Sequence, residues 1–411
     1  LGVKPGERIG TLAVNTYRHV EIYYAVSGMG SVCHTLNPRL FTEQLNYIVN
    51  HAEDSYMFFD IHYLAIIESI APHCPTVKGW IALTDRVHMP KIMPQSKLNL
   101  LCYEELLAAQ SDDYEWPLFD EYTASALCYT SGTTGNPKGV LYSHRSTLLH
   151  AYASSLPDTL CLSATDTILP VVSMFHVHAW AFPYSSALVG AKLVLIGPQM
   201  DSQTIYELFE TEKVTFSAAV PTVWLGLLQY MQEKNLKLST VKRLAIGGSA
   251  APPAMIDTFR EQYGINVLHI WGMTEMTLAT VNTLKAKHQG QSEAEKNKVR
   301  VKQGRSIAGI ELKVVDDAGK ELPRDGKTAG DILIRGPWVT SKYYLADNDD
   351  LLKDGWLPTG DVGNIDPDGY LQLTDRSKDV IKSGGEWISS IDLENLAVAH
   401  PAVAEAAVIA V

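Results

Sequence analysis

The chain has 411 residues, of which 46% are hydrophobic and 19% are charged, and its formal net charge at pH 7 is −12. This length allows two or three domains with a well-buried core, and the composition is that of an ordinary globular enzyme. An acidic balance without any basic stretch excludes a nucleic-acid-binding protein, but it permits a nucleotide substrate, because phosphate sites are local and often carry their own metal ion.

The cysteines and the most apolar stretch indicate the cellular setting. Five dispersed cysteines without C-x-x-C spacing predict free thiols in a reducing compartment, so we expect a cytoplasmic protein without a disulfide framework or a zinc site. The most apolar long stretch, 179–197, contains Pro183 and Lys192, so we do not expect it to span a membrane, and no signal peptide is visible. The chain begins at Leu1 inside a segment typical of mid-domain and stops at Val411 inside a strand-like run. We therefore expect a fragment.

Helical patterns alternate with short apolar runs over the first two thirds of the chain. The strand-like runs are 55–60, 125–130, 167–172, 192–197, 242–248 and 265–271. A helix is expected to open at Pro252 and Pro253. This alternation predicts an α/β fold in which βαβ-type parallel sheets are flanked by helices.

The last third of the chain has a different character. The polar stretch 285–302 lacks apolar periodicity and predicts an exposed loop. The runs 310–316 and 330–336, and the segment 363–375 with its `DPDG` turn, predict a β-rich subdomain at about 303–375. We therefore expect a large N-terminal body, 1–375, followed over 376–411 by the start of a small α+β lid domain. A hairpin at 378–388 and a helix capped by Ser389 would begin this lid.

The segment `YTSGTTGNPKGV` (129–140) follows an apolar strand and suits a phosphate group. Its three glycines let backbone N–H groups approach a ligand, while threonine and serine hydroxyls and Lys138 supply further donors. A flexible surface loop is the alternative. A Walker P-loop is excluded, because the lysine here follows a proline and precedes a glycine.

This segment closely resembles the phosphate-binding signature of the AMP-forming acyl/aryl-CoA ligase, luciferase and adenylation-domain superfamily. Matching blocks follow in the same order, `GGSAAPPAM` (247–255), `HIWGMTEM` (269–276) and `GWLPTGDVGNIDPDGYLQLTDRSKDVIKSGGEWISS` (355–390). Within the superfamily the chain is most similar to bacterial medium- and long-chain fatty acyl-CoA synthetases. The resemblance implies ATP and coenzyme A as co-substrates, AMP as a product, and Mg²⁺.

The resemblance also implies roles for individual residues. Thr130 and Glu275 would contact Mg²⁺, and Thr274 the α-phosphate. Trp271 would stack on adenine opposite the 248–250 backbone, and Asp361 would accept hydrogen bonds from both ribose hydroxyls. The full implied nucleotide and coenzyme set is Thr130, Ser131, Gly132, Thr133, Thr134, Gly135, Lys138, Gly248, Ser249, Ala250, His269, Ile270, Trp271, Thr274, Asp361, Arg376, Lys378, Lys382 and Trp387.

Further positions are implied for the lid and for the acid. Lys378 matches the hinge of the lid, and Lys382 and Trp387 match positions that approach the nucleotide when the lid closes; the lysines could equally be solvated charges. His176 matches a histidine beside the substrate carboxylate, although a core histidine is the alternative and its role as a base stays open. Trp180 matches a gate at the mouth of a fatty-acid tunnel. The implied catalytic residues are Thr130, Lys138, His176 and Glu275.

The implied reaction has two steps. A medium- or long-chain carboxylic acid attacks ATP to give acyl-AMP and pyrophosphate, and the coenzyme A thiol then displaces AMP. The superfamily's adenylation lysine is expected beyond Val411. The alternatives are a ligase for a short or modified acid, such as a methylthioalkanoate or an aryl acid, and a nucleotide-binding fragment without full turnover. The expected partners are small molecules alone, and the sequence leaves a homodimer open.

Overall fold

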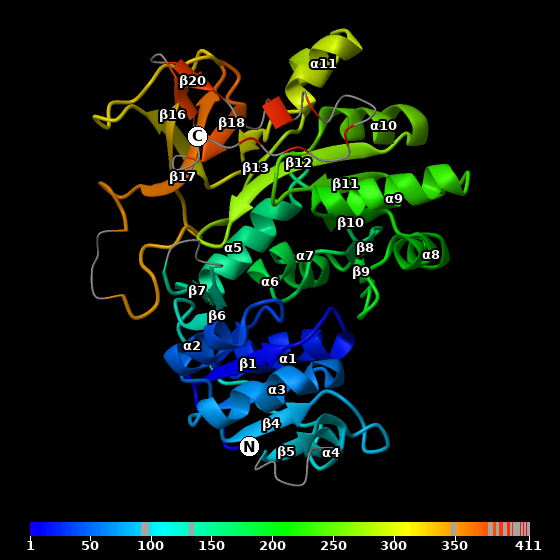
Figure 1. Cartoon of the computed structure of the whole chain (residues 1–411), viewed down its shortest axis with the longest axis vertical. Coiled ribbons are helices and arrows are strands. Elements are labelled where there is room, and N and C mark those ends of the chain that lie inside the picture. The colour runs from blue at the N-terminus through cyan, green and yellow to red at the C-terminus, as the bar shows by residue number, and fades with distance from the viewer. Residues whose placement is uncertain are drawn as a thin grey trace.

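The protein is described by a computed structural model that covers residues 1–91, 98–130, 135–346 and 351–376. It also gives the backbone of 381–383 and 386–388, together with the single positions 393, 394, 397, 403, 406 and 408. The chain runs from a sheet at the N-terminal end, through a second sheet, to a β-rich part near the C-terminal end (Figure 1).

The first sheet has seven strands in the order β5-β4-β3-β1-β2-β6-β7. Its pairs are parallel except for β6 and β7, which form an antiparallel hairpin. The strands are β1 (Arg8–Leu12), β2 (Val32–Thr35), β3 (Tyr56–Phe59), β4 (Gly79–Ala82), β5 (Leu100–Cys102), β6 (Ala124–Tyr129) and β7 (Gly139–Ser143). The accompanying helices are α1 (Tyr17–Gly28), α2 (Thr42–Ala52), α3 (Leu64–Ile70) and α4 (Tyr103–Ala108).

The second sheet also has seven strands, in the order β14-β13-β12-β11-β10-β8-β9. It is parallel from β9 to β12 and antiparallel at β13 and β14. The strands are β8 (Thr167–Pro170), β9 (Lys192–Leu193), β10 (Phe216–Ala219), β11 (Arg243–Ile246), β12 (Asn266–Met273), β13 (Thr277–Val281) and β14 (Arg305–Ser306). The helices of this part are α5 (His144–Ser155), α6 (Val177–Trp180), α7 (Phe182–Val189), α8 (Ser202–Glu212), α9 (Pro221–Glu233) and α10 (Pro253–Tyr263).

The parallel strands are buried almost throughout, which explains why they read as continuous apolar runs in the sequence. The runs at 55–60, 125–130, 167–172, 242–248 and 265–271 all contain strands of the two parallel sheets, so the α/β prediction is confirmed. The run at 192–197 is strand only at Lys192–Leu193. Gly197, at φ +73°, turns the chain where this run ends.

The prediction of an exposed loop over 285–302 is wrong in its second half. Residues Glu293–Arg300 form helix α11, after the short 3₁₀ turn Ala286–His288. The Ser292 side chain accepts a hydrogen bond from the Glu295 backbone, and the Glu295 carboxylate accepts one from the Ser292 backbone, so a capping box starts the helix. No side chain of α11 is buried, so the apolar periodicity that reveals most helices is absent.

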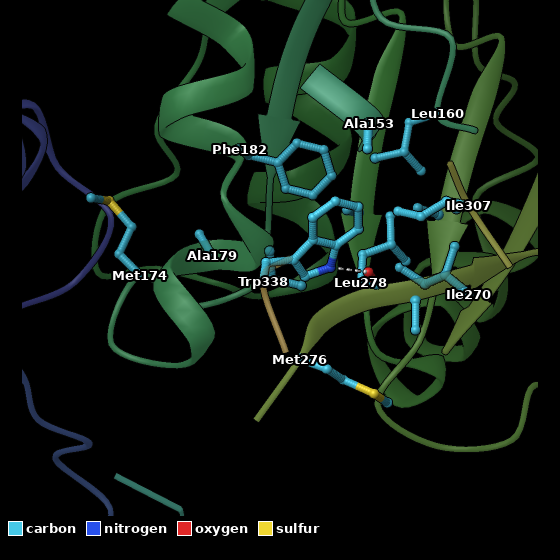
Figure 2. Packing of buried hydrophobic residues seen from close by; sticks show 14 of the residues in the cluster. Ala153, Leu160, Met174, Ala179, Phe182, Ile270, Met276, Leu278, Ile307 and Trp338 are labelled. Carbon is cyan, nitrogen blue, oxygen red and sulfur yellow. Dashed lines mark hydrogen bonds between the residues drawn. The ribbon is translucent and has the colours of Figure 1, made fainter. Parts of the chain in front are cut away.

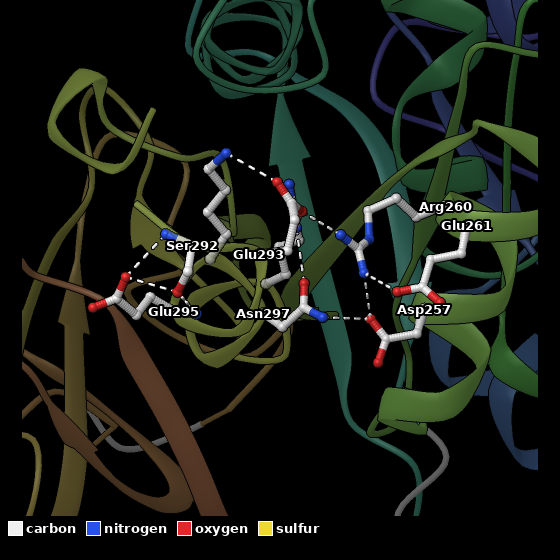
Figure 3. A network of polar contacts seen from close by, with 9 residues as sticks. Asp257, Arg260, Glu261, Ser292, Glu293, Glu295 and Asn297 are labelled. Atoms are coloured by element: carbon white, nitrogen blue, oxygen red, sulfur yellow. Dashed lines mark hydrogen bonds and ion pairs between the residues drawn. The ribbon is translucent and has the colours of Figure 1, made fainter. Parts of the chain in front are cut away.

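Polar contacts attach α11 to α10 instead (Figure 3). Arg260 of α10 forms an ion pair with Glu293, and the Asn297 amide donates to Asp257 at 2.9 Å. Glu293 also accepts from Lys296 and Arg300 of its own helix. The helix is therefore fixed by charge on its polar surface and not by an apolar face.

The β-rich part is a four-stranded antiparallel sheet in the order β15-β16-β17-β18. Its strands are β15 (Glu311–Val315), β16 (Gly330–Arg335), β17 (Leu357–Ile365) and β18 (Leu371–Arg376). The expected hairpin turn lies between β17 and β18, with Gly369 at φ +87°. The strand β14 at 305–306 pairs with β13 of the second sheet. Beyond Arg376, β19 (Ile381–Ser383) and β20 (Glu386–Ile388) pair as the predicted hairpin. Ser389 lies outside the described residues, and the described positions 393, 394 and 397 of the helix expected after it are helical.

One apolar core joins the three parts. Its buried residues come from the first sheet, the second sheet and the antiparallel sheet. Trp338, in the loop after β16, lies against this core and donates its Nε1 hydrogen to the Leu278 carbonyl at 3.2 Å (Figure 2). Helix α5 contacts β6 and β7 of the first sheet and β13 of the second. The loop that follows β16 is thereby held beside both large sheets. Among the described residues, no helix is long and apolar enough to cross a membrane.

Candidate functional site

The segment with the predicted phosphate loop connects the two antiparallel strands β6 and β7. The Thr130 backbone N–H donates to the Lys138 carbonyl at 2.9 Å, and the Lys138 N–H donates to the Thr130 hydroxyl at 3.3 Å. These two bonds close the base of the loop. Gly135 has a φ of +94°, a conformation that glycine adopts without strain. Ser131, Gly132, Thr133 and Thr134 lie outside the described residues.

Glu275 lies in the turn between β12 and β13 and is 6% exposed. Its Oε1 accepts a hydrogen bond of 2.7 Å from the Tyr343 hydroxyl. The Lys138 ammonium lies 4.9 Å from the centroid of the same tyrosine ring. Tyr343 therefore brings together the lysine at the base of the loop and the carboxylate expected at the metal, and no motif in the sequence pointed to this residue.

Two more hydrogen bonds fasten this arrangement. The Tyr142 hydroxyl of β7 donates to the Thr274 carbonyl at 2.6 Å, and the Thr340 N–H donates to the Glu275 carbonyl at 2.8 Å. Burial raises the pKa of the Cys128 thiol to about 11, and the nearby charge of Glu275 adds a smaller part of this rise. Cys128 lies two residues before Thr130, so the Glu275 carboxylate and the start of the loop occupy one neighbourhood.

Asp361 of β17 forms a second polar centre. Its Oδ2 accepts a hydrogen bond of 2.9 Å from the Trp271 indole, and its Oδ1 lies 3.1 Å from the Arg376 guanidinium. Burial raises the pKa of the Asp361 carboxyl, while Arg376 and Trp271 oppose this rise. Asp361 and Arg376 are cross-strand partners on β17 and β18, so the sheet register sets this pair. Trp271 is 6% exposed. Its ring packs in the core, and its indole N–H donates to Asp361.

Gly247 and Gly272 lie where neighbouring segments of the chain approach too closely for a larger side chain. A Cβ on Gly247 would lie 2.7 Å from the Ile270 side chain, and one on Gly272 would lie 1.8 Å from the Thr277 carbonyl oxygen. Gly248, at φ +86°, turns the chain after β11, and Gly248 and Ser249 are exposed while Ala250 is partly so. The exposed backbone of this turn is where the sequence places the second wall of the adenine site.

Two residues of the implied nucleotide set face the interior. The His269 ring is buried and hydrogen bonds to the Val301 carbonyl at 3.0 Å, just after α11. Burial lowers the pKa of His269 to about 4, so the ring is neutral at pH 7. Ile270 is also buried, packed against Gly247. Both are residues of β12 whose side chains lie in the protein interior.

His176 and Trp180 border two cavities. A cavity of about 50 Å³ is bordered by both residues together with Gly248 and Met273. A groove of about 450 Å³ is bordered by the same two residues and by Thr130. His176 keeps an exposed face, and the protein atoms crowding its ring lower its pKa, which favours the neutral form.

The backbone that carries Trp180 is unusual. Val177, His178, Ala179, Trp180 and Ala181 all have φ between +45° and +64°, so α6 is a left-handed turn made without glycine. Such a conformation costs roughly 1–2 kcal/mol per L-residue. Nothing in the sequence indicated it, because a β-branched residue and a tryptophan are poorly suited to this backbone region.

The remaining predicted residues belong to the lid region. Arg376 is exposed apart from its contact with Asp361. Lys378 lies outside the described residues, while Lys382 and Trp387 are placed by backbone only, as a cross-strand pair of β19 and β20.

Comparisons with known proteins decide the family. Residues 1–344 match the family described as AMP-binding enzyme. The chain belongs to this family. The match includes the phosphate loop, Glu275 and Tyr343, and it ends before Asp361.

Relatives of this AMP-binding enzyme extend the match to the whole chain. It is 52% identical to the 3-methylmercaptopropionyl-CoA ligase of Ruegeria lacuscaerulensis, over all of this chain and 76% of that protein. It is 50% identical to the medium-chain-fatty-acid–CoA ligase of Ectopseudomonas oleovorans, over all of this chain and 75% of that protein. The long-chain-fatty-acid–CoA ligase of Thermus thermophilus is 45% identical over 74% of its own length.

Solved structures agree on the fold. A long-chain-fatty-acid–CoA ligase from Archaeoglobus fulgidus superposes with a TM-score of 0.78 at 26% identity, over all of this chain and 78% of that one. An anthranilate CoA ligase in complex with anthranoyl-AMP superposes with a TM-score of 0.87 at 25% identity, over 99% and 75% of the two chains. The prediction of an AMP-forming acid–CoA ligase is confirmed at the level of this family.

Proposed function

We propose that this chain binds ATP between the loop at 130–138 and Asp361 and forms the adenylate of a medium- or long-chain carboxylic acid, for transfer to coenzyme A. The observation that carries the proposal is the junction at Tyr343. It joins Lys138 at the base of the loop to the buried Glu275, beside the groove that Thr130 and His176 border. The medium- and long-chain relatives support the choice of acid.

The two polar centres suit the two ends of a nucleotide. Lys138 and the backbone N–H groups of a glycine-rich loop attract phosphate oxygens. Each carboxylate oxygen of Asp361 accepts one hydrogen bond or ion pair from the protein and retains a second acceptor site. Asp361 therefore has the remaining capacity to accept the two ribose hydroxyls.

The donor set suits a Mg²⁺ ion that arrives with the triphosphate. Glu275 and Thr130 offer oxygen ligands, which this hard cation prefers, and Mg²⁺ is usually held by one or two protein oxygens together with substrate phosphates. Among the described residues, Tyr343 occupies Oε1 of Glu275 and no donor reaches Oε2. No group of three or more histidine, cysteine or acidic side chains forms within the same residues, so an all-protein metal cage is not the arrangement here. A bound ion would supply charge neutralisation at the phosphates.

The chemistry explains why these groups are needed. The attacking carboxylate and the α-phosphate are both anionic, so developing negative charge must be spread over fixed donors. Lys138 supplies a mobile cation beside the loop. Because its protein surroundings favour a neutral His176 at pH 7, that ring can donate a hydrogen bond to a carboxylate without becoming a fixed charge.

A short or modified acid is the second candidate. The smaller of the two cavities that His176 and Trp180 border measures about 50 Å³, and a 52% identical relative is a 3-methylmercaptopropionyl-CoA ligase. Pyrophosphate release by the 411-residue chain should be measured with straight-chain acids of increasing length and with 3-methylmercaptopropionate. A maximum at medium or long chains supports the main proposal, and a maximum at the methylthio acid supports the second.

The site itself is tested by Glu275→Gln. Removing the carboxylate charge should lower pyrophosphate release at least about 10-fold, the size of effect seen for single charge-stabilising groups. Glu321→Gln, an exposed carboxylate in the antiparallel part, is the matched control and should leave the rate unchanged. Equal rates for Glu275→Gln and the unmodified chain would contradict the proposed site.

Binding must be measured beside turnover. Calorimetric titration with ATP shows whether the chain holds the nucleotide, and pyrophosphate release shows whether it reacts. Tight ATP binding without any release would identify the chain as a nucleotide-binding unit.

A further inference from the structure

Tyr343 stands at the meeting point of three segments that are far apart in sequence. Its hydroxyl donates to Glu275, 68 residues earlier, and its ring face receives the Lys138 ammonium. The backbone around it is tied to the same two places. The Thr340 N–H donates to the Glu275 carbonyl at 2.8 Å, and the Tyr344 N–H donates to the Gly139 carbonyl at 2.7 Å.

These backbone bonds leave the tyrosine side chain little freedom. With residues 340 and 344 both anchored, the half-buried ring is held between the turn that carries Glu275 and the first residue of β7. Its hydroxyl is a hydrogen-bond donor, and it donates to the Glu275 carboxylate at 2.7 Å. A donor fixed in this way determines how the carboxylate is turned.

The hydrogen bond has a direct effect on Glu275. A carboxylate can rotate, so without a fixed partner either oxygen could face the loop. Tyr343 engages Oε1 at 2.7 Å, and Oε2 receives no donor within the described residues. The carboxylate therefore presents one unoccupied oxygen in a defined orientation.

The ring has a separate effect on Lys138. This side chain is exposed, so its long stem would otherwise sample many rotamers. The Nζ atom lies 4.9 Å from the ring centroid, within the distance of a favourable cation–π interaction, which contributes about 0.5–1 kcal/mol at exposed sites. The lysine is thus held close to the loop without being neutralised by an anion.

We propose that Tyr343 is the positioning residue of the metal–triphosphate site, in which its hydroxyl orients Glu275 toward the cation and its ring holds Lys138 ready for a phosphate. The inference rests on the proposed function, because it assigns Tyr343 to the same metal and the same triphosphate. It predicts that hydroxyl and ring have separable effects. The hydroxyl controls the part of nucleotide affinity that depends on the metal, and the ring controls the part that depends on the lysine.

The test compares ATP affinity with Mg²⁺ and with EDTA, measured by calorimetry on the 411-residue chain. The dissociation constant in EDTA divided by the dissociation constant with Mg²⁺, called the metal ratio below, isolates the contribution of the metal. Tyr343→Phe keeps the ring and should reduce this ratio about 10-fold, the loss expected for one hydrogen bond to a charged group. Its affinity in EDTA should stay within about 2-fold of the unmodified chain.

Two further variants complete the series. Tyr343→Leu removes ring and hydroxyl, so it should reduce the ratio as Tyr343→Phe does and also weaken binding in EDTA by about 3-fold. Tyr343→Gln returns a donor without a ring and should recover part of the metal ratio, an outcome that a purely structural role would not give. Tyr344→Phe is the matched control, because the Tyr344 ring packs against His51, away from Glu275.

A double-variant comparison separates this inference from the proposed function. If Tyr343 acts through Glu275, adding Tyr343→Phe to Glu275→Gln should cause no further loss of the metal ratio. A normal ratio in Tyr343→Phe combined with a reduced ratio in Glu275→Gln would overturn the role of Tyr343 and leave the proposed site intact. A normal ratio in Glu275→Gln would overturn the metal site itself. Thermal unfolding of each variant identifies any that fails to fold, in which case Tyr343→Gln against Tyr343→Leu decides.

Discussion

Asp361 is the buried carboxylate on which the nucleoside end of the proposed site depends. It is 6% exposed, and its two oxygens lie against the Trp271 indole and the Arg376 guanidinium. The resemblance of the `TGD` motif predicted a carboxylate for the ribose, and the structure adds the two donors that it contacts. Burial raises the pKa of the Asp361 carboxyl, and the two donors counteract that rise.

We expect Asp361→Asn to weaken AMP binding about 10-fold or more, because a neutral amide accepts weaker hydrogen bonds from ribose hydroxyls than a carboxylate does. AMP is the better probe than ATP, since its affinity does not depend on the metal at Glu275. Asp316→Asn, in an exposed turn before β16, serves as the control. Undiminished AMP affinity in Asp361→Asn would remove Asp361 from the nucleotide site.

At the scale of residues, the sequence could predict those that belong to contiguous motifs. Thr130, Lys138, Glu275 and Asp361 each sit in a motif of a few letters. Tyr343 could not be found in this way, because its two partners lie 68 residues or more away and its own neighbours, `SKYYL`, carry no signal. The roles of the motif residues stay predictions until the variants are measured.

At the scale of elements, the apolar patterns predicted the buried strands well and failed where burial does not hold an element in place. Helix α11 lacks the apolar pattern of a helix because none of its side chains is buried and its attachment to α10 is ionic. The `SEAE` box at Ser292–Glu295 was the signal available in the sequence. A helix that is stabilised by caps and ion pairs can be predicted from its capping residues, and not from apolar periodicity.

The left-handed turn at 177–181 was a second surprise at this scale, and it leads to a prediction. Ala181, at φ +64°, should accept glycine at little or no cost, because relief of the backbone strain offsets the loss of one buried methyl group, about 0.8 kcal/mol. Ala187→Gly, on the exposed side of the right-handed helix α7, should instead lower the free energy of unfolding by about 1 kcal/mol.

Urea denaturation of the two variants checks this contrast. If Ala181→Gly is as destabilising as Ala187→Gly, the turn is not left-handed in solution. If Ala181→Gly raises the free energy of unfolding, strain outweighs the lost packing, and residues 177–181 hold that strain in the native state.

At the scale of the whole molecule, the fold class followed from the alternation of strands and helices, while the way in which the sheets join did not. The shared core depends on contacts such as Trp338 with Leu278, between segments 60 residues apart. Local periodicity contains no information on which sheets share a core. The position of the site, where loop, turn and Tyr343 meet, was for the same reason available only from the structure.

Four buried histidines predict how the molecule responds to acid. Burial lowers the pKa of His19 and His269 to about 4, and that of His150 and His178 to about 3, against an ordinary value of 6.5. The native state keeps these rings neutral, while the unfolded chain takes up protons below pH 6.5. The contribution of these neutral rings to the free energy of unfolding is therefore fully present above pH 6.5 and is lost as the pH falls toward 3–4.

Between pH 7 and pH 5.5 the free energy of unfolding should fall by about 1 kcal/mol for each of these histidines, or about 4 kcal/mol together. Urea denaturation at several pH values measures the slope. His269→Gln should make the slope shallower, since glutamine can still donate to the Val301 carbonyl without binding a proton. A free energy of unfolding that does not change over this range would show that the rings are protonated, or exposed, in the native state.

The anchoring of residues 340 and 344 has a consequence for synthesis of the protein. The first sheet is complete once β7 has formed, and the second sheet needs residues up to β14, so both can fold while the rest of the chain is still being made. Lys138 and Glu275 would by then be present but unsupported. The metal–triphosphate half of the proposed site is complete only when the segment through Tyr344 has left the ribosome, and the half at Asp361 follows later, so a nascent chain that has not reached Tyr344 has neither half in place.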